Sequence, residues 1–430
     1  MDYLIVVLGS AVLIYIMFFW SLRMREISDN AKWVPILDPN KGTFLPKSPP
    51  LVSVIVPAHN EQDLIAICLE SIFEQDYPNL EIICVDDRSA DRTAEIVTRI
   101  FGGRSNCKLV TIKERLIGWT GKCHALHEAV KHSSGEWFAF LDADSSLQKT
   151  ALRQCVSEAL RRNVNLVTMS PKFVLKTFWE KALVPTFAAM AAILFPLSKV
   201  NDPRSSVATA NGMFLIISRV AYEKIGGHRN VKDLAVEDIG IGKRVKAAGL
   251  GILFANGRNL LRTRMYSGFH QILDGWTRIL CAAMNYRLPT VLKYLSMHVL
   301  VSLPVFVFAT LLYSRSAIKL SPTLWFLLPL ACLIQMTVTS NLFFDQLGLP
   351  RRFSVYVVLG NLMLIWIFAV MVKKIICRDA LQWRGTTYQH TRYQPKYLEP
   401  SGPEQSKSQT DTRALTTVNG SETPGRPLTS

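Results

Sequence analysis

The sequence predicts an α/β fold, in which a mainly parallel sheet carries helices on both faces, with membrane-spanning helices at both ends of the chain. Between about residues 49 and 285, short β-branched runs alternate with segments whose apolar residues recur at helical spacing. This alternation is typical of parallel sheets that are covered on both faces. Long apolar segments flank the region on each side.

The first apolar segment, residues 3–22, contains no charged residue. About 20 apolar residues are enough to cross a bilayer as a helix. A secretory signal peptide would carry its basic residues before the apolar core, whereas Arg23 and Arg25 follow it here. We therefore expect a retained anchor. Since cytoplasmic flanks carry the excess of Lys and Arg, we expect the chain that follows to be cytoplasmic.

Three more apolar segments near the end of the chain are each long enough to span, at roughly 295–313, 324–344 and 355–372. Four spans in total would place the C-terminus outside. Lys373, Lys374 and Arg378 follow the last segment directly, and such basic flanks favour the inside. The alternative is that one segment is re-entrant or interfacial, so the number of spans stays open.

Residues 178–200 are also apolar, but Pro185 and Pro196 interrupt them. A span here would place the motifs that follow on the wrong side of the membrane. We expect the segment to lie in the membrane interface, where it could admit a lipid from the leaflet. A buried core helix is the alternative.

The formal charge of +16 is concentrated between residues 145 and 200 and between 239 and 287. Nucleic-acid binding is one explanation of such basicity, and a solvated basic face is another. For a chain anchored at both ends we expect instead an anionic membrane surface, which attracts each nearby Lys or Arg by about 1 kcal/mol. We expect no nucleic-acid partner. The eight cysteines form no C-x-x-C pair, which argues against a zinc site.

Acidic side chains stand at the ends of three predicted strands, which cover residues 51–57, 80–87 and 137–144. They are Glu61, Asp86, Asp87, Asp142 and Asp144. Ligands of parallel sheets bind beyond the carboxyl ends of the strands. Asp142 and Asp144 are two residues apart and would project to the same side, where a hard divalent cation would neutralise them. A chance D-x-D on a solvated turn is the alternative.

Five motifs resemble, in order and spacing, the family 2 glycosyltransferases, whose GT-A fold is a Rossmann-like α/β fold. They are SVIVPAHNE, VDDRSADRT, FLDAD, TANGMFLI and VEDIGIGKRVKAAG, and the similarity covers roughly residues 50–280. The stretch GWTGKCHAL, together with membrane segments at both ends, is similar to lipid glycosyltransferases of the hopanoid-associated and carotenoid-acid types. It is more distantly similar to ceramide glucosyltransferase.

The resemblance implies roles for the strand-end acids. Glu61 and Asp86 match positions that hold the uracil and ribose of a UDP-sugar, and Asp87 adjoins them. Asp142 and Asp144 match the family's metal-binding pair for Mg²⁺ or Mn²⁺, with Asp144 as the direct ligand. Asp142 also belongs to the expected donor site.

Asp238 matches the family's general base, which would deprotonate the acceptor hydroxyl. An acid that only complements a helix N-terminus is the alternative for this residue. Trp276 matches the tryptophan that closes the site near the acceptor, and an interfacial aromatic is its alternative.

One departure from the family concerns the Gln-x-x-Arg-Trp motif of polymer-forming members. Gln271 is followed here by Ile-Leu-Asp, Gly275 and Trp276, so the arginine that meets the pyrophosphate is missing. We expect Arg278 or Lys122 to take its place. The few C-terminal spans and this departure favour a single sugar transfer over chain extension.

The sequence therefore predicts a metal-dependent, inverting membrane glycosyltransferase that moves one sugar from a nucleotide-sugar, expected to be a UDP-sugar, to a lipid acceptor. The alternatives are a processive polysaccharide synthase and a non-catalytic nucleotide-binding scaffold. The expected parts are an anchor at 1–24, a linker at 25–48, a cytoplasmic catalytic domain at 49–288, a membrane region of about three helices at 289–376 and a polar, disordered tail at 377–430.

Overall fold

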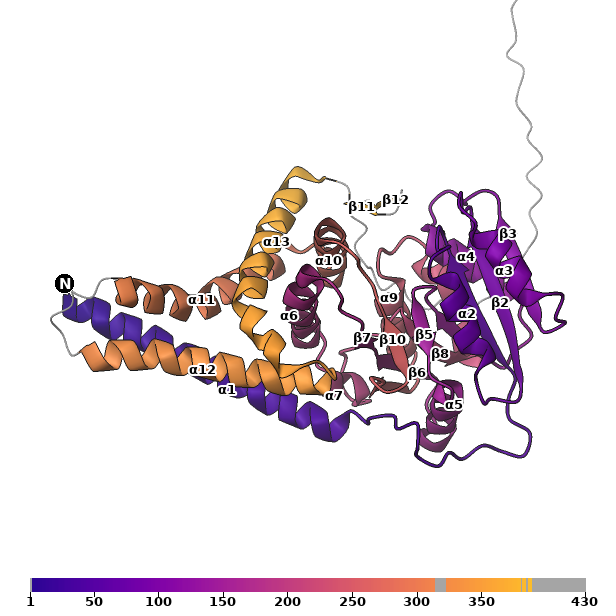
Figure 1. The fold of residues 1–430 in the computed structure, drawn as a ribbon, viewed down its shortest axis with the longest axis horizontal. Helices are drawn as coiled ribbons and strands as arrows, with labels where there is room; N and C mark the ends of the chain where they lie inside the picture. The colour runs from indigo at the N-terminus through magenta and orange to yellow at the C-terminus, as the bar shows by residue number, and fades with distance from the viewer. Residues whose placement is uncertain (1, 314–321, 380, 384–385, 389–430) are drawn as a thin grey trace, which may run out of the picture. The chain divides into compact units, whose positions relative to one another are not determined.

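The computed structural model describes residues 2–313, 322–379, 381–383 and 386–388. The predicted tail beyond residue 388 lies outside the described residues. Figure 1 shows the α/β domain at one side of the described chain and the long apolar helices at the other.

A seven-stranded sheet forms the centre of the α/β domain, in the order β3-β2-β1-β4-β8-β6-β9. Neighbours are parallel throughout, except that β8 runs antiparallel to both β4 and β6. The prediction of a mainly parallel sheet is confirmed. The strands are β1 (Val52–Ala58), β2 (Leu80–Asp87), β3 (Cys107–Ile112), β4 (Trp137–Leu141), β6 (Leu166–Ser170), β8 (Phe214–Ser218) and β9 (Ile252–Asn256).

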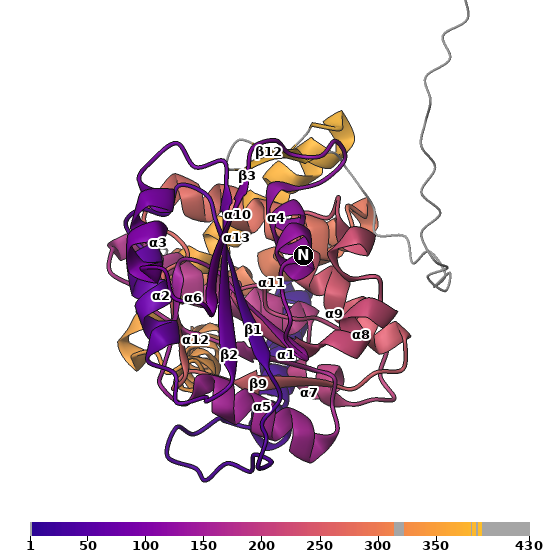
Figure 2. The same cartoon turned by 90° about the vertical axis from the view of Figure 1, so that its right-hand side faces the viewer.

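Helices cover both faces of this sheet, as Figure 2 shows. On one face lie α2 (Ile65–Phe73), α3 (Thr93–Phe101) and α5 (Ala151–Arg162), and on the other α4 (Gly121–Lys131), α8 (Arg219–Lys224) and α9 (Glu237–Ala247). Strand β1 shows why helices must pack on both faces of the sheet. Val54 and Val56 belong to the core of the first face, whereas Ile55 belongs to that of the second. Side chains that alternate along a strand must both be buried in such a sheet.

A small three-stranded sheet extends the fold beside the end of β4. Its central strand is β10 (Leu261–Thr263), which pairs with β5 (Ser145–Leu147) and with β7 (Lys172–Phe173). Because β5 starts immediately after Asp144, this pairing fixes the turn that carries Asp142 and Asp144.

The N-terminal helix α1 (Asp2–Trp33) extends beyond the predicted end of the anchor at residue 24. The expectation that residues 25–33 belong to a linker is therefore wrong. These residues include no Gly or Pro, and ion pairs at helical spacing join Arg23 to Glu26 at 2.7 Å and Arg25 to Asp29 at 4.0 Å. The helix ends before Val34, which precedes Pro35, and a proline disfavours helix in the residue before it.

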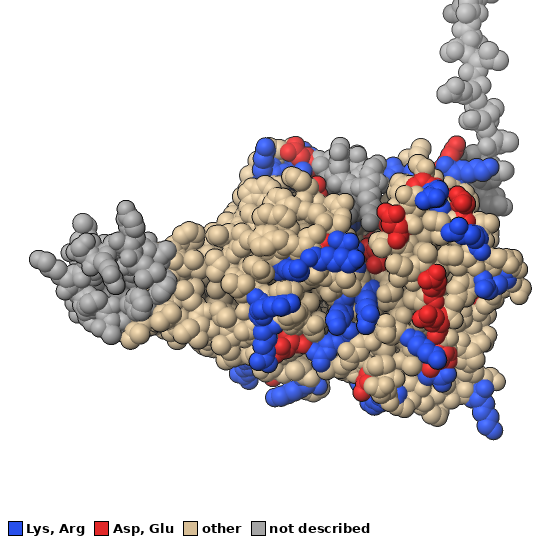
Figure 3. Space-filling model, in the orientation of Figure 1, with Lys and Arg blue, Asp and Glu red and all other residues tan. Residues whose placement is uncertain are grey.

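Among the described residues, four helices are long and apolar enough to cross a membrane. They are α1 and the three C-terminal helices α11 (Leu288–Tyr313), α12 (Pro322–Gln346) and α13 (Val357–Cys377). Helix α1 lies beside α12 (Figure 1), where Gln335 donates a hydrogen bond to the Ser21 hydroxyl at 2.7 Å. Figure 3 shows a wide surface over these helices without charged side chains, while Lys and Arg gather where the helices meet the α/β domain.

The predicted interfacial segment 178–200 forms helix α6 (Phe178–Leu194) and the short α7 (Leu197–Asn201), with Pro196 between them. A capping box of Thr177 and Glu180 starts α6. The helix packs against α10 (Phe269–Ala283) and α13 through one apolar cluster that includes Phe187, Trp276 and Phe368. The rest of the described chain contains the 3₁₀ turns Gly227–Val231 and Arg351–Tyr356 and the hairpin of β11 (Leu381–Trp383) and β12 (Thr386–Tyr388).

Candidate active site

The carboxyl ends of β1, β2 and β4 open on one cavity of about 200 Å³, which we call the polar cavity. Parallel strands that lie side by side bring their carboxyl ends to the same edge, which explains the convergence. The predicted site residues that line it are Glu61, Asp87, Lys122, Asp142, Asp144 and Arg278.

Asp86 is buried and does not line this cavity. Its Oδ1 accepts a hydrogen bond from the Ser89 backbone N–H at 3.3 Å, so it shapes the loop after β2. Asp87 does reach the cavity, where it is paired with Arg88 at 2.8 Å. Helix α4 begins beside them, and a Cβ on Gly121 would lie only 2.5 Å from Oδ2 of Asp87. Only glycine allows the start of α4 to approach this carboxylate so closely.

Lys122, the second residue of α4, joins a carboxylate just after β4 to a carboxylate at the start of α9. Its Nζ lies 2.7 Å from Oδ1 of Asp142 and 2.8 Å from Oε1 of Glu237. Burial alone would lower the pKa of Lys122, but the two carboxylates outweigh burial and raise it. The same ion pair lowers the pKa of Glu237 against the opposing effect of burial. Both groups are therefore charged at neutral pH.

Asp238 lies in the first turn of α9, next to Glu237. Its Oδ2 accepts a hydrogen bond from the Gly212 backbone N–H at 2.7 Å, and its Oδ1 accepts one from its neighbour Ile239 at 2.8 Å. Burial, reinforced by the adjacent Glu237 carboxylate, raises the pKa of Asp238 to about 6. A carboxylate with this pKa is ionised at pH 7 and is still basic enough to accept a proton.

A second and larger cavity, of about 460 Å³, adjoins the first, and we call it the apolar cavity. Its lining comes from the α/β domain and from helices α1, α6, α10 and α12, and most of it is apolar. Asp238 and Trp276 line this cavity only. The two cavities share lining residues that include Lys122, Asp142, Met213, Glu237, Met265 and Arg278. They meet where the charged cluster lies.

The three predicted site residues of α10, Trp276, Arg278 and Gln271, differ in their position relative to the two cavities. Trp276 is buried against Phe187, with ring centroids 5.4 Å apart. Arg278 lines both cavities and donates a hydrogen bond to the Ala235 carbonyl. Gln271 is exposed, accepts hydrogen bonds from Ser267 and lines neither cavity. The structure thus does not bring Gln271 to the candidate site.

The acids at the end of β4 can hold part of a metal's coordination shell. Asp142 and Asp144 both line the polar cavity, and Ser145 donates a hydrogen bond to Oδ1 of Asp144 at 3.2 Å. Within the described part of the chain, no group of three or more His, Cys, Asp or Glu is placed to hold a metal ion. Mg²⁺ and similar ions commonly take one or two carboxylates and complete the shell with water and substrate phosphates. The two aspartates fit that arrangement.

Glu237 and Arg88 were missed as site residues, although both line the polar cavity. Each follows or precedes a predicted acid directly in the chain, Arg88 after Asp87 and Glu237 before Asp238. That adjacency was the available signal for them. Thr120 also lines the cavity and stands inside the stretch GWTGKCHAL, whereas Tyr266, another lining residue, lies in none of the motifs.

Comparison with known proteins agrees with this arrangement. Residues 53–226, which contain β1, α4 and the acids at the end of β4, match the profile of glycosyl transferase family 2. The resemblance to family 2 glycosyltransferases that the motifs predict is therefore confirmed for this region.

The 4,4'-diaponeurosporenoate glycosyltransferases of Staphylococcus aureus strains USA300 and NCTC 8325 are 27% identical to the chain over 245 residues. The alignment covers 56% of this chain and 64% of each relative, which is less than two thirds of the relatives' length. Among solved structures, the mannosyltransferase PcManGT from Pyrobaculum calidifontis, in complex with GDP-Man and Mn²⁺, aligns with a TM-score of 0.51 at 20% identity. That alignment covers 85% of this chain and 98% of PcManGT. The α/β domain of this chain has the GT-A fold.

Proposed function

We propose that the chain is a membrane-bound glycosyltransferase that transfers one sugar from a nucleotide-sugar to a lipid acceptor with inversion of the anomeric centre. One observation carries the proposal. A polar cavity at the strand ends and an apolar cavity toward the long helices meet at Lys122, Asp142 and Glu237, beside Asp238. An enzyme that joins a charged donor to an apolar acceptor needs these two compartments.

The polar cavity suits the donor. Glu61 and Asp87 offer acceptor oxygens for a nucleoside, for which we propose UDP, and Arg278 and Lys122 offer positive charge for the diphosphate. Helix α4 begins on the cavity wall at Gly121, and a helix N-terminus attracts phosphate. A divalent ion held by Asp144 and Asp142 would supply further positive charge for the leaving diphosphate.

The apolar cavity suits a lipid. Its walls include Phe195, Leu197, Ile279 and Leu347, whose burial against an acceptor chain would be favourable. The indole N–H of Trp276 is buried without a hydrogen-bond partner in the described chain, and it is available to an acceptor oxygen. A growing polysaccharide would need hydrogen-bonding partners along such a path, so the apolar walls favour a lipid acceptor over a polymer.

The proposed reaction is a direct displacement. The acceptor oxygen attacks the anomeric carbon, the bond from that carbon to the β-phosphate oxygen breaks, and Asp238 takes the acceptor proton. The electron pair of the broken bond leaves with the nucleoside diphosphate, whose charge Lys122 and Arg278 stabilise. One displacement inverts the anomeric centre. The hydrogen bonds from Gly212 and Ile239 hold the base in place.

We place the catalytic domain at the cytoplasmic face of the membrane, with the long apolar helices in the bilayer. The uncharged surface over those helices and the Lys and Arg side chains at their junction with the catalytic domain support this placement (Figure 3).

The test uses the purified full chain in detergent with total lipid extract, Mg²⁺ or Mn²⁺, and radiolabelled UDP-sugars or GDP-mannose. We expect label on a discrete lipid in the organic phase. Asp238→Asn should lower the rate by at least about 100-fold. Asp233→Asn, an exposed acid five residues earlier, should not. Label confined to insoluble polymer, or no label with any donor, would contradict the proposal.

A further inference from the structure

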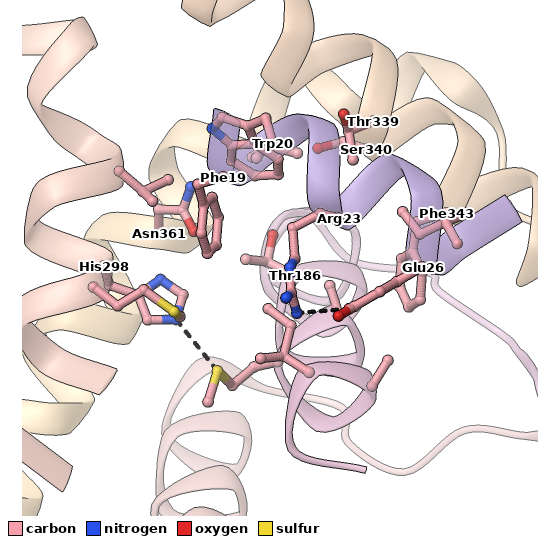
Figure 4. A pocket seen from close by; sticks show the side chains of 18 of the residues that line it. Phe19, Trp20, Arg23, Glu26, Thr186, His298, Thr339, Ser340, Phe343 and Asn361 are labelled. Carbon is pink, nitrogen blue, oxygen red and sulfur yellow. Dashed lines mark hydrogen bonds and ion pairs between the residues drawn. The ribbon is translucent and has the colours of Figure 1, made fainter. Parts of the chain in front are cut away.

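A third cavity, of about 90 Å³, lies among the long helices rather than in the catalytic domain (Figure 4). Helices α1, α6, α11, α12 and α13 all contribute to its lining, and we call it the interhelical cavity. It touches the apolar cavity through three shared lining residues, Asn30, Ala192 and Phe343. The wall is mainly apolar, but Arg23, Thr186, His298 and Asn361 place polar groups in it.

Three of these residues, Arg23, Thr186 and His298, have a buried polar atom without a hydrogen-bond partner in the described chain. The Thr186 hydroxyl and the Nε of Arg23 are buried and make no hydrogen bond within the described chain. Glu26 pairs with Nη1 of Arg23 at 2.7 Å, but its own side chain is 43% exposed at the edge of the cavity. A buried donor without a partner costs about 1–3 kcal/mol, so a ligand with acceptor oxygens would be stabilised here. A guanidinium has five donors, and the one ion pair leaves several for such a ligand.

The level of the interhelical cavity along the long helices indicates the kind of ligand. Arg23 directly follows the uncharged segment 3–22 of α1, and Phe19 and Trp20 line the cavity just before it. Aromatic residues followed by basic ones are typical of the level of the lipid headgroups. Thr339 and Ser340 lie near the end of α12, and Asn361 lies near the start of α13, which follows Arg351 and Arg352. The helix ends next to the catalytic domain therefore surround the cavity.

We propose that the interhelical cavity binds the phosphate and ester region of an anionic membrane phospholipid, at a site separate from the acceptor path. The Arg23 guanidinium and the Thr186 hydroxyl bind the oxygens of this region, and the apolar wall around Met190 and Phe344 takes the start of an acyl chain. The bound lipid joins α1, α6 and α12 on the wall shared with the apolar cavity. This proposal holds whether or not the chain transfers sugar, and its test reads no activity.

The experiment measures lipid binding to the delipidated full chain in detergent by native mass spectrometry. The probes are phosphatidylglycerol, diacylglycerol with the same acyl chains, and inorganic phosphate. The variants Arg23→Gln and Thr186→Val each have a matched control. Arg25→Gln removes a basic side chain of α1 that is 81% exposed, and Thr186→Ser keeps the hydroxyl.

We expect one phosphatidylglycerol to bind at least about tenfold more tightly than diacylglycerol, as lost hydrogen bonds to a charged group imply. Arg23→Gln should remove this preference, and Thr186→Val should reduce it by about threefold to tenfold, with both controls unchanged. Equal binding of the two lipids, an equal loss in Arg25→Gln, or full competition by inorganic phosphate would each overturn the proposal. If Arg23→Gln does not fold, the comparison of Thr186→Val with Thr186→Ser tests the proposal.

Discussion

The backbone N–H of Gly212 donates a hydrogen bond to Oδ2 of Asp238 at 2.7 Å, which ties the loop before β8 to the first turn of α9. The Gly212 carbonyl also accepts a hydrogen bond from Nζ of Lys122 at 3.4 Å. One residue thus contacts both the proposed base and the cation that joins Asp142 to Glu237. The position of Asp238 depends on this loop as much as on its own helix.

Gly212→Ala tests that dependence. A Cβ here would lie 3.0 Å from Oδ2 of Asp238 and 3.2 Å from Nζ of Lys122, so both side chains must move by a few tenths of an ångström. We expect kcat to fall by about tenfold to 100-fold, because small displacements of catalytic groups are costly, with little change in melting temperature. Gly42→Ala, where a Cβ meets nothing within 4 Å, is the control. Wild-type kcat in Gly212→Ala would show that the loop does not position the base.

The pH dependence of kcat/KM should report Asp238. The carboxylate must be ionised to accept a proton, so activity should fall about tenfold per pH unit below its pKa of about 6. Glu237→Gln removes the neighbouring negative charge that helps to raise this pKa, so the acidic limb should move to lower pH. Glu95→Gln, an exposed acid on α3, should leave the limb in place. A limb that moves upward in Glu237→Gln would contradict the assignment of the base.

Lys122→Met should move the acidic limb of the kcat/KM profile to higher pH. The positive charge of Lys122 lowers the pKa of Asp238, and without it burial and Glu237 act unopposed. We also expect kcat/KM at pH 7.5 to fall by about 100-fold, because the leaving diphosphate loses a cation. Lys122→Arg keeps the charge and should retain the limb of the wild type. If Lys122→Met and Glu237→Gln shift the profile in the same direction, the limb belongs to another group.

Asp144→Asn should separate metal binding from nucleotide binding. We expect the variant to bind the nucleoside diphosphate without metal as the wild type does, and to lose the tightening that Mn²⁺ causes, measured by isothermal titration calorimetry. The expected loss is about tenfold or more, since the ion would keep one carboxylate instead of two. Asp91→Asn, on the loop before α3, is the control. Full Mn²⁺ tightening in Asp144→Asn would remove Asp144 from the metal site.

The parts of the site that the sequence predicted are those that depend on local pattern. Asp87, Asp142 and Asp144 end strands whose β-branched composition was readable, and parallel pairing carries them to one edge without further information. Both Asp86 and Asp87 are buried, but Asp86 points to the other side of its strand and does not line the polar cavity, because side chains alternate along a strand. The motif alone did not separate the two acids.

The parts that the sequence could not predict depend on segments that are distant in the chain. Lys122 meets Glu237 only because α4 and α9 cover the same face of the sheet. The apolar cavity likewise needs α1, α6, α10 and α12 together, and no periodicity within one helix shows that its face borders a cavity instead of a core. The continuation of α1 to Trp33 was missed for a simpler reason, since hydropathy marks the end of a span and not the end of a helix.

Two alanines of α6 offer a way to separate the two cavities that this helix borders. Ala191 lines the apolar cavity and Ala189 lines the interhelical cavity, and neither lines both. Ala191→Leu should raise KM for the lipid acceptor by about tenfold, because overpacking costs about 1–3 kcal/mol, while hydrolysis of the donor without acceptor stays unchanged. Ala189→Leu should keep the acceptor KM and instead weaken phosphatidylglycerol binding. Because both substitutions add the same atoms to the same helix, a general disturbance of α6 would affect both measurements in both variants. If the two cavities hold distinct ligands, Ala191→Leu should change only the acceptor KM and Ala189→Leu only phosphatidylglycerol binding.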